Sequence, residues 1–165
     1  MIGGLVVGFL AACAMGRKRR RITIEALPRC TGYVVLFAPN DASSRALDRA
    51  TGGLGYSHAA LDLCVQAEDG SRQLVDCTIL RGVHLAPWSN YAGRACAMVP
   101  LEAAETAEAR GAARQLYGKP WGYAPGGWTC ADFVFECLPS AFDLEIARPV
   151  TANGLARALG VEHAA

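Results

Sequence analysis

The chain has 165 residues, of which 52% are hydrophobic and 19% are charged, a size that is enough for one globular core and short for two. The formal net charge is +1, but residues 17–21 supply five of the sixteen Lys and Arg residues, so the rest of the chain is mildly acidic. Such a domain is not expected to bind nucleic acid. We therefore expect a hydrophobic segment with a basic cluster at residues 1–21 and a single domain at residues 22–165.

Residues 2–15 are continuously apolar or small. As a helix they would span roughly 20 Å, which is less than the ~30 Å hydrocarbon core of a bilayer. The basic cluster follows this segment, an order that favours the cytoplasmic side of a membrane. Alternatively, residues 10–13 resemble a bacterial lipoprotein box, in which Cys13 would be lipidated and the domain exported. We expect membrane contact through residues 2–15 and leave open both the membrane face and whether Met1 or Met15 is the start.

Apolar runs rich in β-branched residues predict strands, and helix-forming runs between capping and stop residues predict helices. In chain order we expect a strand, a short helix capped by Asp41 or Ser43, four further strands, and three helices, the first of them opened by Pro100. The expected strands are residues 32–38, 56–65, 73–80, 82–85 and 95–99. The expected helices are residues 44–50, 101–117, 129–138 and 152–159.

The strand expected at residues 56–65 alternates between an apolar and a polar face, because successive side chains point to opposite sides of a sheet. The apolar face, which we expect in the core, carries Ala59, Leu61, Leu63 and Val65. The other face carries His58, Ala60, Asp62 and Cys64. The returning strand places Val75, Cys77 and Ile79 on its core side, and Asp76 and Thr78 on the other.

The cysteines form no Cys-x-x-Cys pair and no Cys/His cluster at zinc spacing. We therefore expect no metal site, no cofactor and no fully paired disulfide framework. Most free cysteines are small buried hydrophobic residues, and a set of free thiols is easier to keep in a reducing compartment. The seven cysteines are Cys13, Cys30, Cys64, Cys77, Cys96, Cys130 and Cys137.

Cys130 stands in the first turn of an expected helix, with Thr129 as its cap. The unpaired backbone N–H groups and the dipole at a helix start stabilise a thiolate, and they can also stabilise an oxyanion. Cys130 is therefore the candidate nucleophile. Cys137 lies two turns later on the same face and is expected to be a core residue.

A cysteine nucleophile needs a neighbouring imidazole and a polar group that orients it. Of the three histidines, His163 lies in the C-terminal tail, whereas His58 opens a strand on its polar face and is the natural partner of Cys130. Asp76 is a better orienting group than Asp62, which lies about 13 Å from His58 along the same strand. His84 stays an alternative orienting group.

The position of Asp76 depends on the register of the hairpin. A two-residue turn at Asp69-Gly70 would set Leu63 opposite Asp76 and turn Asp76 to the core face. Burying Asp76 while exposing Val75 and Ile79 would cost several kcal/mol. We therefore expect a longer or bulged turn that places Asp76 beside His58.

Four short segments follow one another along the chain: Tyr56-Ser57-His58-Ala59-Ala60-Leu61, Leu74-Val75-Asp76-Cys77-Thr78 with Gly82-Val83, Gly118-Lys119-Pro120-Trp121-Gly122-Tyr123, and Trp128-Thr129-Cys130-Ala131-Asp132-Phe133-Val134. In the order of these segments the chain resembles the circularly permuted NlpC/P60 enzymes, which are papain-like proteins that include YiiX-like and lecithin:retinol acyltransferase-like members. The resemblance covers roughly residues 30–160, and residues 148–151 with the helix after them look like the closing segment of that family.

The resemblance implies an α+β, papain-like fold, in which a small antiparallel sheet or half-barrel packs on helices and the His strand precedes the Cys helix. It also implies a triad of Cys130, His58 and Asp76. The aromatic residues before the nucleophile either wall a substrate groove or hold a packed loop, and Tyr56 either covers the nucleophile or packs. The candidate substrate-binding residues are Tyr56, Ser57, Trp121, Tyr123 and Trp128.

The expected activity is that of a thiol amidase or peptidase, in which the Cys130 thiolate attacks an amide carbonyl and His58 serves as base and then acid. Water then hydrolyses the acyl-enzyme, whereas a lipid or amine acceptor would make the same site an acyltransferase. The partners implied are peptide, N-acyl or lipid-like substrates, and the oligomeric state is left open. A lipid-ester hydrolase and an inactive binding module are the alternatives.

Overall fold

The computed structural model describes residues 30–122, 129–146 and 148–162. The expectations for residues 2–15, the lipoprotein box, Tyr123, Trp128 and His163 therefore lie outside the described residues. Within the described part of the chain, no helix is long and apolar enough to cross a membrane.

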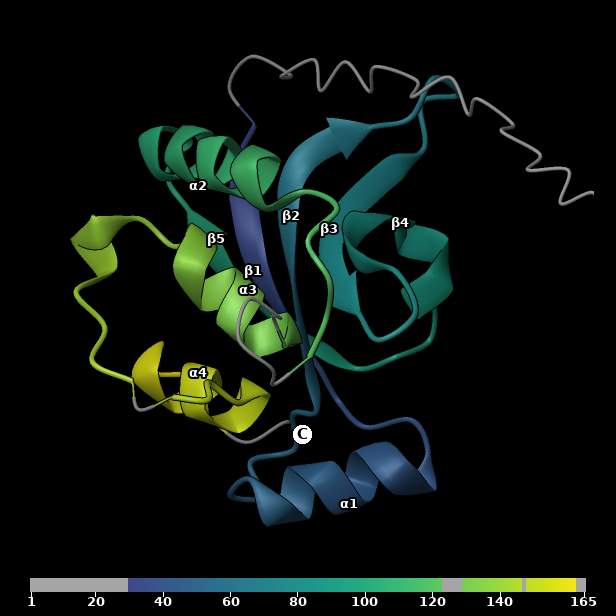
Figure 1. Ribbon diagram of the computed structural model, residues 1–165, viewed down its shortest axis with the longest axis vertical. Coiled ribbons are helices and arrows are strands. Elements are labelled where there is room, and N and C mark those ends of the chain that lie inside the picture. Colours follow the sequence, from purple (N-terminus) through teal and green to yellow (C-terminus); the bar gives the residue numbers. More distant parts are fainter. Residues whose placement is uncertain (1–29, 123–128, 147, 163–165) are drawn as a thin grey trace, which may run out of the picture.

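The chain forms an α+β fold around an antiparallel five-stranded sheet, which confirms the expected class (Figure 1). The strands are arranged in the order β4-β3-β2-β1-β5. They are β1 (Gly32–Phe37), β2 (His58–Gln66), β3 (Arg72–Thr78), β4 (Gly82–Pro87) and β5 (Cys96–Leu101). The helices are α1 (Ala42–Ala50), α2 (Ala103–Leu116), α3 (Cys130–Cys137) and α4 (Ala152–Ala158), with short 3-10 turns η1 (Trp88–Tyr91) and η2 (Ser140–Phe142).

Two details of the predicted elements are wrong. Pro100 does not open a helix; it lies in β5, and α2 begins at Ala103 after Glu102, whose N–H is accepted by Glu105. Proline is tolerated there because β5 is an edge strand that pairs only with β1. Ile79 is not a core residue: β3 ends at Thr78, and Ile79 is 71% exposed in the turn to β4.

The two faces of the sheet carry separate hydrophobic clusters. On the first face, Ala59, Leu61, Leu63 and Val65 pack with residues of α2, α3 and α4, which lie together on one side of the sheet (Figure 1). On the second face, Trp88 and Tyr91 of η1 pack over a smaller cluster. This cluster consists of Val35, Phe37, Ala60 and Leu74.

The segment that contains η1 explains why the second face is buried. β4 ends at Pro87 opposite Gln73, at the end of the sheet farthest from His58, whereas β5 starts at Cys96 opposite Phe37, at the His58 end. The connection must therefore run back across the second face. It covers the side chains that sequence alternation assigned to a polar face, including the fully buried Asp62.

The cysteine pattern needs one correction. Cys30 and Cys64 form a disulfide, although we expected free thiols and a reducing compartment. The sequence separation of 34 residues carries no motif, but β2 brings Cys64 beside Cys30, which lies two residues before the start of β1. Disulfides are typical of oxidising compartments, so the argument for a reducing one fails. The described cysteines that lie outside this disulfide are Cys77, Cys96, Cys130 and Cys137.

Candidate active site

Cys130 occupies the first turn of α3, where the sequence placed it. The Oγ1 atom of Thr129 accepts the N–H of Asp132 at 3.1 Å and so caps the helix. The helix packs on β2 and β3, and its buried residues join the first hydrophobic cluster. The thiol of Cys130 lies at the end of the sheet where β2 begins, because it interacts with His58 and with the N–H of Ala59.

His58 and Asp76 meet at the same end of the sheet. The Nε2 atom of His58 lies 2.9 Å from Oδ1 of Asp76, and the side chains are 16% and 0% exposed, respectively. The structure thus brings together the three residues that the sequence proposed as a triad.

The hairpin register that makes this contact agrees with the expectation of a longer or bulged turn. Gln66 pairs with Arg72, so the turn is longer than two residues, and the register shifts between Leu61 and Val65. After the shift Leu61 pairs with Val75. Asp76 consequently lies on the second face with His58 and not in the first hydrophobic cluster.

The electrostatics of the pair favour a thiolate and an imidazolium. Burial alone would raise the pKa of Cys130, but attraction to His58 and hydrogen bonds from His58 and from the N–H of Ala59 lower it below its ordinary value. Burial alone would lower the pKa of His58, but attraction to Cys130 and hydrogen bonds with Asp76 and Cys130 raise it. Both shifts favour the state in which the imidazole carries the proton.

Asp76 is held as a carboxylate by donors from two directions. Burial alone would raise its pKa, but hydrogen bonds from His58, Tyr91 and the N–H of Cys77, together with the charge of His58, lower it. The N–H of Cys77 lies 2.6 Å from Oδ1, and the hydroxyl of Tyr91 donates to Oδ2. The Asp76 carboxylate contacts the Nε2 atom of His58 and so fixes the orientation of the imidazole ring, whose other side interacts with Cys130.

Tyr91 is a site residue that the sequence reasoning missed. Besides donating to Asp76, its ring stacks on His58 with centroids 5.9 Å apart and on Phe37 at 4.5 Å. The guanidinium of Arg94 lies over the Phe37 and Tyr91 rings and donates to the carbonyl of Ala38. A tyrosine in the loop after β4 carries no local motif, so only the return of that loop across the sheet reveals its place.

Removing the Tyr91 hydroxyl tests this contact. We expect Tyr91→Phe to slow iodoacetamide alkylation of Cys130 at about pH 6 by about three- to tenfold, since one charge-assisted hydrogen bond to Asp76 is lost while the ring stack stays. The measurement is the second-order alkylation rate. Tyr117→Phe, a change at an exposed residue of the segment after α2, is the control and is expected to react as the parent does. Equal rates for both variants would contradict the role of the hydroxyl.

The two alternative polar residues have other partners. Asp62 accepts hydrogen bonds from Trp88 at 2.8 Å and Arg72 at 2.7 Å, so it holds the η1 connection and not His58. The Nδ1 atom of His84 lies 2.9 Å from the carbonyl of Gly82, to which it donates. Among the candidates, Asp76 is therefore the carboxylate in contact with His58.

The described substrate-binding candidates lie mainly in packed positions. Tyr56 is 2% exposed in the first hydrophobic cluster, and its hydroxyl donates to the carbonyl of Glu162. Ser57 is buried beside His58, and its hydroxyl has no hydrogen-bond partner among the described residues. Trp121 is half-buried against the first cluster. Cys137 is a buried core residue, as expected, and burial raises its pKa to about 12.

Helix α4 of the closing segment contacts the chain just before His58. Asn153 of α4 is fully buried and accepts the N–H of Tyr56 at 3.1 Å. Its amide group also donates to Asp48 and Thr51 at the end of α1. Asn153 thereby fixes the chain that leads into His58.

No family model, curated protein or solved structure matches the chain. Within the described residues, no group of three or more His, Cys, Asp or Glu side chains is placed to hold a metal ion.

Proposed function

We propose that the protein is a cysteine-dependent hydrolase that cleaves an amide bond of a peptide or N-acyl substrate through an acyl-enzyme. The observation that carries this proposal is the arrangement of Cys130 at a helix start, in contact with His58, which in turn contacts the buried Asp76. A low thiol pKa, a base and an orienting group are the elements of an activated nucleophile.

The proposed reaction has two halves. The Cys130 thiolate attacks the carbonyl carbon, and N–H groups at the start of α3 stabilise the oxyanion. The His58 imidazolium then protonates the leaving amine as the C–N bond breaks, which leaves a thioester and a neutral imidazole. Neutral His58 takes a proton from water, the resulting hydroxide equivalent attacks the thioester, and the free acid and thiolate are released.

We further propose a papain-like fold of the permuted NlpC/P60 kind. The resemblance of the four sequence segments supports this assignment, as does the topology, in which the His58 strand precedes the Cys130 helix and the helix packs on an antiparallel sheet. The α2–α4 layer on one face of the sheet agrees with it.

One observation favours the alternative of a lipid-ester hydrolase or thiol acyltransferase. β3 ends at Thr78 at the end of the sheet where β2 begins, and the turn that follows exposes Ile79 and Leu80 to 71% and 94%. Large exposed aliphatic side chains near a nucleophile suit a lipid-like substrate. A substrate panel should therefore include acyl esters as well as peptide and N-acyl amides.

Labelling with a thiol-reactive probe, together with the substrate panel, distinguishes an enzyme from an inactive binding module. We expect a chloroacetamide activity probe to label the purified protein at one cysteine, with labelling abolished in Cys130→Ser and retained in Cys137→Ser. Cys137 is the matched control because it lies on the same helix but its pKa is raised by burial. Equal labelling of several cysteines, or no turnover of any amide or ester in the panel, would contradict the proposal.

A further inference from the structure

We propose that the bulge in β2 between Leu61 and Val65, pinned by the Cys30–Cys64 disulfide, Asp62 and Arg110, is the device that positions Asp76 against His58. The inference rests on the proposed function, because it concerns the orienting residue of that site. The Cys30–Cys64 disulfide lies near the end of β2 that is remote from His58.

The register of the hairpin shows what the bulge achieves. Next to the turn, Gln66 pairs with Arg72 and Val65 with Gln73. If that register continued, Asp76 would lie opposite Asp62, and His58 would be about 13 Å away at 3.3 Å per residue. Two buried carboxylates would also face each other.

After the bulge the pairing is different. Leu61 pairs with Val75, which sets Asp76 opposite Ala60. His58 then becomes the diagonal neighbour of Asp76 on the same face, a position within reach of a long side chain. The shift of two residues moves Asp76 by about 6.6 Å toward His58.

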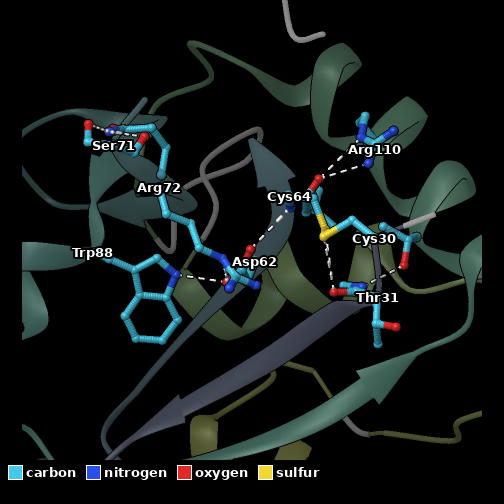
Figure 2. A network of polar contacts seen from close by, with 12 residues as sticks. Cys30, Thr31, Asp62, Cys64, Ser71, Arg72, Trp88 and Arg110 are labelled. Atoms are coloured by element: carbon cyan, nitrogen blue, oxygen red, sulfur yellow. Dashed lines mark hydrogen bonds and ion pairs between the residues drawn. A yellow bond between two sulfur atoms is a disulfide. The ribbon is translucent and has the colours of Figure 1, made fainter. Parts of the chain in front are cut away.

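A bulge takes backbone groups out of the strand ladder, and these groups need other partners. The N–H of Cys64 donates to Oδ1 of Asp62 at 3.1 Å. The carbonyl of Leu63 accepts from the Arg110 guanidinium of α2 at 2.9 Å (Figure 2). Cys64 itself has a φ of 60°, a backbone region that is unfavourable for a residue other than glycine, and the disulfide to Cys30 holds it there.

The same network reaches the other side of Asp76. The Oδ2 atom of Asp62 accepts from Arg72 and from the indole of Trp88, and both side chains converge on it in Figure 2. Trp88 begins the turn η1, which ends at Tyr91, whose hydroxyl donates to Asp76. Asp62 therefore holds both the strand that presents Asp76 and the turn that covers it. The positioning residues are Cys30, Cys64, Asp62 and Arg110.

The test is the double variant Cys30→Ser/Cys64→Ser, compared with Cys96→Ser, which removes an exposed thiol of β5. We expect the pH profile of Cys130 alkylation in the double variant to move to higher pH, with a rate about tenfold lower at about pH 6, since His58 loses a neighbouring carboxylate. NMR titration of the nitrogen-15-labelled imidazoles should show the pKa of His58 shifted downward. Cys96→Ser should match the parent in both measurements.

Repeating the comparison in an Asp76→Asn background separates positioning from general stability. The disulfide change should then alter the alkylation rate by less than about twofold, because its effect passes through Asp76. A full tenfold loss in that background would overturn the proposal. An unchanged profile in the folded double variant would overturn it as well.

Arg110→Met provides a second variant that keeps the disulfide, in case the double variant does not fold. We expect it to shift the profile in the same direction by about threefold, and an unchanged profile would contradict the proposal. Neither measurement needs a substrate. If the parent Cys130 titrates as an ordinary thiol, the proposed function fails, whereas a reactive parent with unaffected variants refutes only the role of the bulge.

Discussion

Replacing His58 with Gln is expected to slow the alkylation of Cys130 by on the order of 10²- to 10³-fold at about pH 6. The thiolate is the reacting form, and in the parent it is stabilised by the charge and the hydrogen bond of His58. Without the imidazolium, Cys130 returns toward an ordinary thiol, which is almost entirely protonated at this pH. The rate of reaction with iodoacetamide across a pH series measures the effect.

The directions of the pKa shifts of Cys130 and His58 predict how the rates of alkylation and hydrolysis depend on pH. The pKa of Cys130 is lowered, so alkylation of the parent should begin at a lower pH than alkylation of a free thiol. The pKa of His58 is raised, so the imidazolium that protonates the leaving group is lost only on the alkaline side. Hydrolysis should therefore show a bell-shaped profile, whereas alkylation should show the acid limb alone.

His84→Gln is the matched control for this experiment. His84 lies on β4, and its ring donates to the carbonyl of Gly82. We expect its profile to coincide with that of the parent, which would also decide against His84 as the orienting group. A His58→Gln protein that remains folded and keeps the parental acid limb would refute the pairing of His58 with Cys130.

The residues of the triad were accessible from the sequence because their placement depends on local rules. The alternation of β2 put His58 on the face opposite Leu61, and matching the alternation of the returning strand to it put Asp76 on the same face as His58. The expected cost of burying Asp76 was the wrong reason, since Asp76 is fully buried on this face and is stabilised there by hydrogen bonds. The helix start at Cys130 was marked by Thr129. Each of these inferences uses neighbours within a few positions in the chain.

The supporting parts of the site depend on contacts between distant segments, and the sequence did not reveal them. Tyr91 reaches Asp76 only because the connection from β4 to β5 turns back over the second face of the sheet. The disulfide joins residues separated by 34 positions, and the bulge at Cys64 interrupts an alternation that looks regular in the sequence. Local pattern gives the face of a strand, but it does not give the residue that lies opposite.

The packing of α3, the helix that begins at Cys130, depends on Asp132. Replacing Asp132 is therefore expected to lower the stability of the protein substantially. The carboxylate of Asp132 is buried, accepts the Thr129 hydroxyl at 2.7 Å and accepts the N–H of Val150 at 2.9 Å. Asp132→Ala leaves both donors buried without these acceptors. We expect the free energy of unfolding to fall by about 3 kcal/mol, measured by urea denaturation.

Glu136→Ala is the control on the same helix, since Glu136 is exposed and its ion pair with Arg148 lies at the surface. A surface pair contributes about 1 kcal/mol or less, so this variant should unfold near the parental midpoint. Asp132→Asn keeps one acceptor oxygen and should fall between the two. Because Val150 belongs to the segment that leads into α4, equal midpoints for Asp132→Ala and Glu136→Ala would mean that this closing segment does not hold the Cys130 helix in place.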